Sequence, residues 1–309
     1  MLRLVDLPLI LLSFNRVSAF VMIKIRFCSS DQKNCKRTAK KRKPMESYNE
    51  YHKDPAEFPF LKSFQEYWQP IRDEFTQFIQ SASPTERHLS SQVMGPKSKT
   101  ITTRGKSKYT AFGILFQGLF IEDYVRTHQI TYPDYSSTVA ADKVLAIREK
   151  YFPQLAEIIA QTNITYQDVI RNVYFGTFLP GLDVKLHVNH NPHMNRGYLG
   201  LIVPAGDVAM QICHETLYWY EGKFMVLDHS YPHCPHNRTP HKRTVLIVDF
   251  FRTDRPRDEV TQFERERVAQ RMKDNPYSLG VFGKNDKAKD EDFIKYGLDH
   301  QLEWDKVLS

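Results

Sequence analysis

Two histidines and one arginine have the spacing of a metal site with an anion-binding group beside it. His187 ends an extended apolar run, His233 lies 46 residues later, and Arg243 follows ten residues after that. Neutral imidazole binds first-row transition metals well, and two imidazoles leave coordination positions open for substrates. A cation on a neighbouring strand is suited to holding the carboxylate of a co-substrate. This pattern predicts a metal-dependent oxygenase.

The residue two positions after His187 bears on the kind of metal site. A histidine two residues before a carboxylate forms the first half of a two-histidine, one-carboxylate iron site, but position 189 is asparagine. Asp183 is the alternative carboxylate, although four residues upstream on a strand its side chain has a different reach. The residues themselves therefore predict His187 and His233 as ligands and leave the third position open.

Eight of the twelve histidines fall between positions 187 and 241, and six of these eight lack a ligand-like context. A histidine in a loop is usually a surface or hydrogen-bonding residue. We therefore predict non-ligand positions, with roles left open, for His190, His193, His214, His229, His236 and His241. A zinc-binding loop over residues 232–237 is the alternative, but this segment has no thiolate pair and no third clearly spaced histidine.

The net charge of +7 is unevenly distributed along the 309 residues. Residues 1–45 hold eleven of the 43 basic residues and two of the 36 acidic ones, so they carry +9 and the rest of the chain carries −2. Because the body is close to neutral, we do not expect it to bind nucleic acid. If the basic tail did so, residues 46–309 alone would lose that binding.

The first 27 residues are apolar but interrupted. Asn15 and Arg16 separate two apolar runs, whereas a membrane-spanning helix needs roughly 20 mostly apolar residues. We expect a basic, disordered tail over 1–45, with a weak membrane anchor, a targeting segment or a functional start near Met45 as alternatives. The four cysteines lack clustered spacing, which indicates reduced thiols. The expected location is the cytoplasm, with membrane association as the alternative.

Apolar periodicity predicts helices in the first half of the chain and strands in the second. A helix is predicted over 57–80, with Pro70 marking a break or a fresh first turn, and a basic loop over 81–110. Helices are predicted over 138–161, where Pro153 begins the second piece, and over 258–273. The predicted strands are 169–179, 184–188, 198–203, 208–213, 216–220, 223–227 and 244–251.

Many short strands at regular spacing indicate a sandwich or jelly roll. We predict a mainly β protein with flanking helices, in the α+β class, built on a double-stranded β-helix core. The expected parts are the tail 1–45, a helical lead-in with the basic loop over 46–165, a jelly-roll catalytic core over 166–255, and a charged, partly helical extension over 256–309. His187 and His233 would then lie near strand ends of facing sheets. Arg243 would point inward, where its charge requires an anionic partner.

Between residues 180 and 252 the chain resembles the aspartyl/asparaginyl β-hydroxylase family of iron- and 2-oxoglutarate-dependent dioxygenases. The resemblance rests on the order and spacing of short motifs. These motifs are Pro180-Gly181, His187, Arg196, Leu199 to Pro204, Glu215-Thr216, Trp219, Glu221-Gly222-Lys223, Asp228, Ser230, His233, Arg243 and Ile247-Val248-Asp249. Residues 57–75, which contain Trp68 and Ile71-Arg72-Asp73-Glu74, are similar to the family's helical lead-in.

The resemblance implies a reaction and a set of binding residues. Members of this family commonly hold Fe(II) with two histidines and no carboxylate, so His187 and His233 correspond to the ligands. Arg243 corresponds to the arginine that pairs with the distal carboxylate of 2-oxoglutarate, and Arg196 to a second basic contact. Such enzymes use O2 to convert 2-oxoglutarate to succinate and carbon dioxide while hydroxylating a C–H bond. The implied substrate is the β-carbon of Asp or Asn residues in a protein or peptide.

The chain departs from the family pattern at several positions. Tyr198 stands where a histidine is often found, and Gly176 replaces a serine that helps to bind the co-substrate in the animal enzymes. We expect the adjacent Thr177 to substitute for that serine. The family also includes bacterial lipid A hydroxylases, so an acyl-chain hydroxylase is one alternative. A cupin-like metal-binding protein without oxygenase activity is another, because His233 and Asn237 have the spacing of part of a cupin motif.

Overall fold

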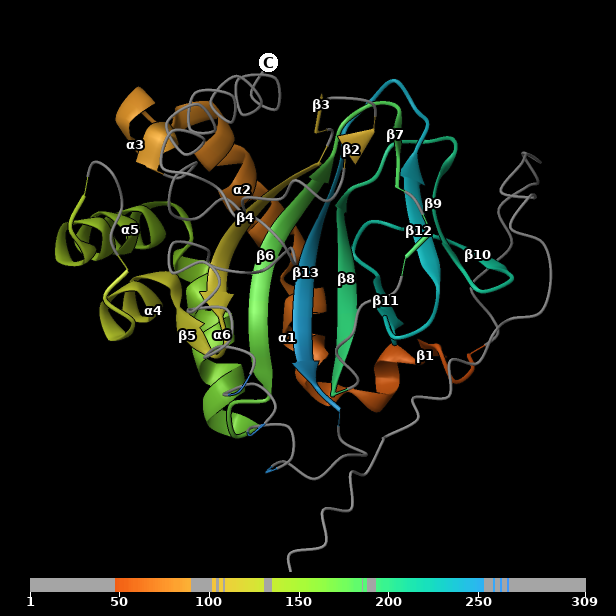
Figure 1. Ribbon diagram of the computed structural model, residues 1–309, viewed down its shortest axis with the longest axis horizontal. Helices are drawn as coiled ribbons and strands as arrows, with labels where there is room; N and C mark the ends of the chain where they lie inside the picture. The colour runs from red at the N-terminus through yellow and green to blue at the C-terminus, as the bar shows by residue number, and fades with distance from the viewer. Residues whose placement is uncertain are drawn as a thin grey trace, which may run out of the picture. The chain divides into compact units, whose positions relative to one another are not determined.

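The computed structural model describes residues 48–89, 102–103, 106–107, 109–130, 135–184, 186–187 and 193–252, with the isolated helical positions 258, 262 and 266 (Figure 1). By its internal contacts the chain divides into residues 1–37 and 38–309, and the described fold belongs to the second unit. The expected tail over 1–45 and most of the expected helix over 258–273 lie outside the described residues. None of the helices in the described ranges combines the length and apolarity needed to span a bilayer.

The larger of the two main sheets has seven antiparallel strands in the order β1, β11, β8, β13, β6, β4, β5. Their bounds are β1 His52–Lys53, β4 Tyr109–Phe116, β5 Leu119–Phe120, β6 Ile170–Phe178, β8 Met194–Ile202, β11 Phe224–Leu227 and β13 Arg243–Phe251. Every residue of β13 is buried, because this strand lies between β6 and β8 and both of its faces are covered.

The smaller sheet has four antiparallel strands in the order β10, β9, β12, β7. Their bounds are β7 Leu182–Asp183, β9 Val208–Ile212, β10 Glu215–Tyr218 and β12 His233–Asn237. Beyond β7 the pairing with β12 resumes at one isolated bridge, between His187 and His233. A separate hairpin joins β2 Thr102–Thr103 and β3 Lys106–Ser107. The smaller sheet therefore carries both predicted metal ligands.

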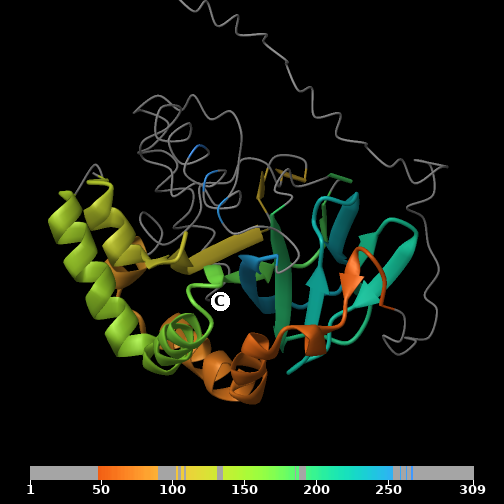
Figure 2. The ribbon, with the colours of Figure 1, turned by 90° about the horizontal axis from the view of Figure 1, so that it is seen from below.

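Two apolar cores lie on opposite faces of the larger sheet. Leu246 and Val248 of β13 enter a core shared with the helices, whereas Val245 and Ile247 enter a core shared with Met210 of β9. This follows from the alternation of side chains along a strand. Figure 2 shows the long helices and the smaller sheet on either side of the larger one. The second core is the interior of a jelly-roll barrel, so the predicted double-stranded β-helix with flanking helices is confirmed.

The helices that cover the outer face begin and end where the sequence provides the signals. Tyr67 separates α1 from α2, Pro70 lies in the first turn of α2, and Pro153 begins α6 as predicted. Glu74 of α2 accepts hydrogen bonds from the first backbone N–H groups of α6, which joins the two helices. The helices are η1 Pro55–Glu57, η2 Pro59–Leu61, α1 Lys62–Glu66, α2 Trp68–Ser81, α3 Pro84–Leu89, α4 Ile121–Thr127, α5 Ser137–Tyr151 and α6 Pro153–Thr165.

The structure corrects several expectations about elements. The expected boundary at residue 165 does not separate the sheet, because β1 and β4 pair with strands of the expected core. Residues 84–89 of the expected loop form α3, and the expected strand 184–188 is replaced by β7 at residues 182–183. Sequence analysis treated residues 234–237 as loop, but they continue β12. Burial of Pro235 and Asn237 between neighbouring strands explains a strand of such unusual composition.

Candidate active site

His187 and His233 are neighbours in one sheet, which corrects the expectation that they would come from facing sheets. Their backbones exchange two hydrogen bonds of 3.0 and 2.9 Å, and their ring centroids are 4.2 Å apart. Nδ1 of His233 lies 2.8 Å from the carbonyl oxygen of Tyr231. A proton on Nδ1 donates to that carbonyl and leaves Nε2 as the free lone pair, which is the arrangement seen in many metal-binding histidines.

A third imidazole lies against this pair. The ring centroid of His229 is 4.2 Å from that of His233, and its Nε2 lies 2.8 Å from the hydroxyl oxygen of Tyr198. His229 lies in a turn, as the sequence predicted, but it is buried and not at the surface. The signal that could have identified it is its place in the motif Asp228 to His233, four residues before the predicted ligand.

The buried imidazoles of this group are kept neutral. Burial, followed by the nearby charge of His187, lowers the pKa of His233 to about 3. Burial, followed by the charges of His233, Arg196 and His187, lowers the pKa of His229 well below its ordinary value. Neutral imidazole is the form that binds a metal ion. The donor chemistry of the histidine pair therefore fits a first-row transition metal.

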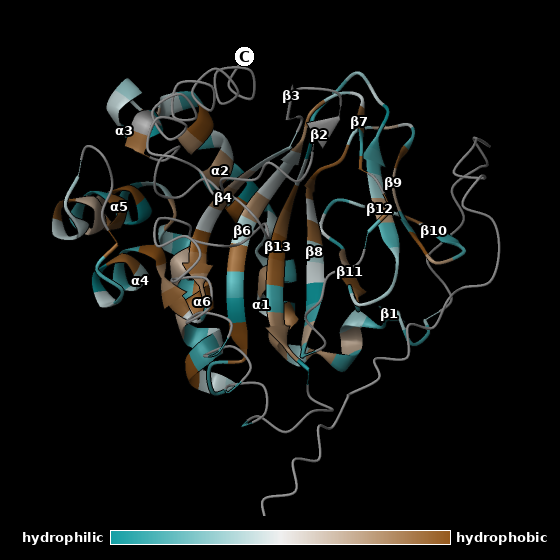
Figure 3. Ribbon diagram, in the orientation of Figure 1, coloured by the Kyte–Doolittle hydropathy of each residue, from teal (hydrophilic) through white to brown (hydrophobic). Residues whose placement is uncertain are grey.

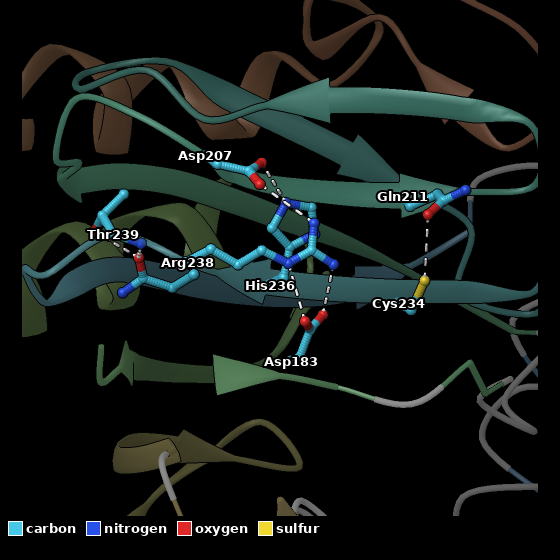
Figure 4. Close-up of polar contacts among 8 residues, drawn as sticks. Asp183, Asp207, Gln211, Cys234, His236, Arg238 and Thr239 are labelled. Atoms are coloured by element: carbon cyan, nitrogen blue, oxygen red, sulfur yellow. Dashed lines mark hydrogen bonds and ion pairs between the residues drawn. The ribbon is translucent and has the colours of Figure 1, made fainter. Parts of the chain in front are cut away.

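The carboxylate that the sequence left as an alternative ligand is not at this site. Asp183 is exposed and forms two 2.9 Å hydrogen bonds with Arg238, as Figure 4 shows. Arg238 also contacts Asp207, which accepts a 2.7 Å hydrogen bond from Nε2 of His236 when that atom is protonated. Position 189 lies outside the described residues. Within the described ranges no three His, Cys, Asp or Glu side chains form a metal-binding group.

Arg243 is fully buried in the barrel interior and has no acidic partner among the described residues. Its guanidinium carbon lies 3.6 Å from the ring centroid of Phe178 and 4.1 Å from that of Trp219. Nη1 is 3.5 Å from the carbonyl oxygen of Gly176, and Nε and Nη2 have no hydrogen-bond acceptor among the described residues. Burial lowers the pKa of Arg243 to about 9. An anionic ligand would be stabilised here, because its hydrogen bonds to the guanidinium would replace the water that Arg243 loses on burial.

Arg196 lies in the same interior but its charge is already matched. Its guanidinium forms hydrogen bonds of 2.5 and 2.9 Å with Asp249, and Asn172 donates a further 3.0 Å bond to that carboxylate. Burial opposes the charge of Arg196, but the carboxylate outweighs it and raises the pKa of Arg196 well above its ordinary range. These three residues form a hydrophilic band across β6, β13 and β8 (Figure 3). Arg196 is near enough to lower the pKa of His229 and of His233.

The structure does not bring Thr177 to this group. Its hydroxyl lies 3.0 Å from that of Thr244, the residue opposite it in the sheet. Because successive side chains on a strand alternate, Thr177 lies on the face opposite Phe178, whose ring contacts Arg243. The hydroxyl expected to stand in for the missing serine thus faces the helices.

A buried carboxylate holds the loop that precedes His233. Asp228 accepts hydrogen bonds from the backbone N–H and the hydroxyl of Ser230, at 3.0 and 2.7 Å, and forms an ion pair with Arg252. The backbone N–H of Asp228 donates to the carbonyl of Tyr51 beside β1. These contacts hold the loop from both sides, so they fix the turn that carries His229 and the entry to β12, which begins at His233.

Comparison with solved structures found distant likenesses to cupin proteins. Solved structures similar to the chain include a cupin domain of an XRE-family transcriptional regulator from Enterobacter cloacae, at 14% identity over 26% of this chain and 81% of that chain, with a TM-score of 0.23. Another is a cupin conserved-barrel protein from Salinispora arenicola, at 14% identity over 31% of this chain and 71% of that chain, with a TM-score of 0.23. The fold assignment rests on the strand order and not on these distant likenesses.

Sequence comparison gives a more specific result. The ornithine lipid ester-linked acyl 2-hydroxylase of Rhizobium tropici is 26% identical over 257 residues, which cover 82% of this chain and 72% of that protein. The family model described as aspartyl/asparaginyl β-hydroxylase matches residues 65–253, more than half of the chain, and includes the histidine pair and both buried arginines. The chain therefore belongs to the aspartyl/asparaginyl β-hydroxylase family.

Proposed function

We propose that this protein is an Fe(II)- and 2-oxoglutarate-dependent dioxygenase that hydroxylates a C–H bond. Family membership supports hydroxylase activity. The single observation that carries the co-substrate assignment is Arg243, a fully buried cation with two donors that have no acceptor among the described residues. The distal carboxylate of 2-oxoglutarate can accept hydrogen bonds from these donors while the co-substrate is bound.

Each polar residue of the interior has a defined part in this proposal. His187 and His233 hold the metal, His233 as a neutral imidazole, and Arg243 binds the distal carboxylate. Arg196, oriented by Asp249, provides a second positive charge close to the histidines. The metal held by these residues would activate O2, which is the oxidant, and 2-oxoglutarate would supply two electrons and leave as succinate and carbon dioxide. Thr177 is left out of the binding set, because its side chain lies on the opposite face of the sheet.

Two substrates are compatible with this chemistry. The family description favours the β-carbon of Asp or Asn residues in a protein or peptide. A second candidate, an acyl chain of a lipid, is favoured by the Rhizobium relative, whose name describes an acyl 2-hydroxylase acting on ornithine lipid. We propose a cytoplasmic location with the side-chain substrate and a membrane-associated one with the lipid. The proposed membrane contact through residues 1–27 lies outside the described residues.

Metal binding tests the histidine assignment. His187→Ala and His233→Ala should each remove Fe(II) from the anaerobically loaded protein, because each deletes one of two protein ligands. His241→Ala is the matched control, since its side chain is exposed and lies outside the pair. Iron per chain is measured after desalting. Full stoichiometry in both ligand variants would contradict the assignment.

Binding of 2-oxoglutarate tests the arginine assignment. Calorimetry on the metal-loaded full chain should show binding that is lost in Arg243→Ala and kept in Arg238→Ala, an arginine outside the barrel interior. The substrate is then sought by mass spectrometry of cell proteins and lipids. Products with one added oxygen that disappear with His187→Ala identify it. Failure of the wild-type protein to bind 2-oxoglutarate would overturn the proposed function.

A further inference from the structure

Two adjacent side chains in the barrel interior hold donors that have no acceptor among the described residues. These donors are Nε and Nη2 of Arg243 and the indole Nε1 of Trp219. Trp219 is 1% exposed and Arg243 is 0% exposed. A buried donor without an acceptor destabilises the protein, and the N–H of a buried tryptophan usually has a partner. Because the two side chains are in contact, with the guanidinium carbon 4.1 Å from the Trp219 ring centroid, one acceptor group is a candidate partner for all three donors.

The backbone fixes Trp219 in this place. The residue lies where the chain leaves β10 in the smaller sheet and crosses to β11 in the larger one. The crossing passes so close to β8 that a Cβ on Gly200 would lie 2.1 Å from the carbonyl oxygen of Tyr220. Gly222 then turns at a φ of +68° beneath the indole of Trp68. Since neither glycine tolerates a side chain easily, the indole is held by main-chain geometry.

The rings around the guanidinium form a corner that leaves one edge of Arg243 for a ligand. The planes of Phe178 and Trp219 are 81° apart, and the guanidinium carbon is close to both. Nη1 points toward the carbonyl of Gly176, so Nε and Nη2 form the remaining edge. That edge matches the two oxygens of a carboxylate.

We propose that the indole N–H of Trp219 donates a hydrogen bond to the carboxylate that Arg243 binds. This inference rests on the proposed function and deepens it, because the carboxylate is the distal one of 2-oxoglutarate. A carboxylate has about four lone-pair sites, enough to accept from the three donors together. Trp219 is thus a binding residue as well as an aromatic wall. If Trp219 contributed only an aromatic contact to the guanidinium, phenylalanine would provide the same contact.

Paired ligands separate the hydrogen bond from the ring contact. The full chain is loaded with Zn(II), and calorimetry is run with 2-oxoglutarate and with 2-oxovalerate, in which a methyl group replaces the distal carboxylate. Trp219→Phe should weaken 2-oxoglutarate binding about tenfold or more, as expected for a hydrogen bond to a charged group. Zn(II) affinity and 2-oxovalerate affinity should not change. Trp68→Phe is the matched control and should bind both ligands as the wild type does.

Nitrogen-15 labelling of the indoles gives a direct readout. The chain has three tryptophans, so the Zn(II)-loaded protein has three indole N–H signals. Addition of 2-oxoglutarate should shift one signal strongly and slow its exchange with water, and that signal should be absent from Trp219→Phe. If this variant does not fold, as judged by circular dichroism, the signal is assigned by elimination with Trp68→Phe and Trp304→Phe.

The outcomes separate this inference from the function on which it rests. If the wild-type protein does not bind 2-oxoglutarate, the proposed function fails and this inference fails with it. If the wild-type protein binds while Trp219→Phe binds equally well, the inference alone is overturned. A Trp219 signal that does not respond to 2-oxoglutarate overturns it independently of any variant.

Discussion

Two arginines in one interior show how the surroundings of a charge determine its role. Arg196 is paired with Asp249 through two hydrogen bonds, so its charge is matched before any ligand binds. Arg243 is more deeply buried and has aromatic rings where Arg196 has a carboxylate. The attraction between a cation and a ring is worth about 2 kcal/mol when the cation is desolvated, and burial lowers the pKa of Arg243. We therefore propose that Arg243 is kept for ligand binding at the expense of stability.

The two arginines should respond oppositely to the same substitution. Arg243→Met should stabilise the ligand-free protein by roughly 1–3 kcal/mol, because it removes unsatisfied buried donors and keeps the contact with the rings. Arg196→Met should destabilise it by about 3–5 kcal/mol, because Asp249 would remain buried without its cation. Urea unfolding of both variants measures the difference. A loss of stability in Arg243→Met would show that an unseen partner already matches its charge.

At the scale of elements, one of the segments that pass between the two sheets, from β10 to β11, shapes the proposed anion site around Arg243. The segment from β10 to β11 carries Trp219 and pairs with β8 through a single parallel bridge, Gly200 to Glu221. The absence of a side chain at Gly200 permits this approach. β12 has an equivalent role for the metal site, because it places His233 beside His187. The site thus depends on the contacts between strands more than on any one loop.

Gly200→Ala tests the importance of that crossing. Its Cβ would meet the backbone oxygen of Tyr220 at 2.1 Å, so the crossing must move and Trp219 with it. We expect the free energy of unfolding to fall by at least about 1–3 kcal/mol. The affinity for 2-oxoglutarate should fall as well. Gly197→Ala is the control, since its Cβ would meet a side chain, the ring of Phe224, at 3.1 Å. Equal stability and affinity in the two variants would refute a special role for the close approach at Gly200.

At the scale of the whole molecule, the proposed site residues and the excess of positive charge lie in different parts of the chain. The barrel interior holds His229, His233 and Arg243 among buried apolar residues, whereas His187 is exposed. Residues 1–45 carry +9, whereas the remaining residues carry −2. We therefore expect residues 1–45 to be responsible for attraction to anionic surfaces, and the barrel to be responsible for binding of the co-substrate.

Removal of residues 1–45 should separate the two properties. The full chain should bind vesicles that contain phosphatidylglycerol, and added salt should weaken that binding, because Lys and Arg near an anionic surface contribute about 1 kcal/mol each. The fragment 46–309 should lose vesicle binding and keep its affinity for 2-oxoglutarate. Both are measured by vesicle co-sedimentation and calorimetry. Salt-sensitive vesicle binding by the fragment would instead locate a basic surface on the folded body.

The sequence by itself determined the fold class, the family and the set of residues to consider. Alternating apolar residues predicted the strands β6, β8, β9, β10, β11 and β13 to within a few residues, because this pattern is a local property. The spacing of His187, His233 and Arg243 within family motifs gave the candidate site. The apolar pattern did not predict β12, because its histidines, proline and asparagine have low strand propensity and are held in place by neighbouring strands.

Only the tertiary structure decided which side chains meet. His229 is one of six histidines in the sequence that look alike, and it joins the pair because the Asp228 loop folds against β1 and β8. Thr177 faces away from Arg243 because one position along a strand reverses the side chain. Trp219 meets Arg243 through a crossing between sheets that no local pattern encodes. Such contacts depend on burial and pairing between residues distant in the chain, and composition and spacing do not contain that information.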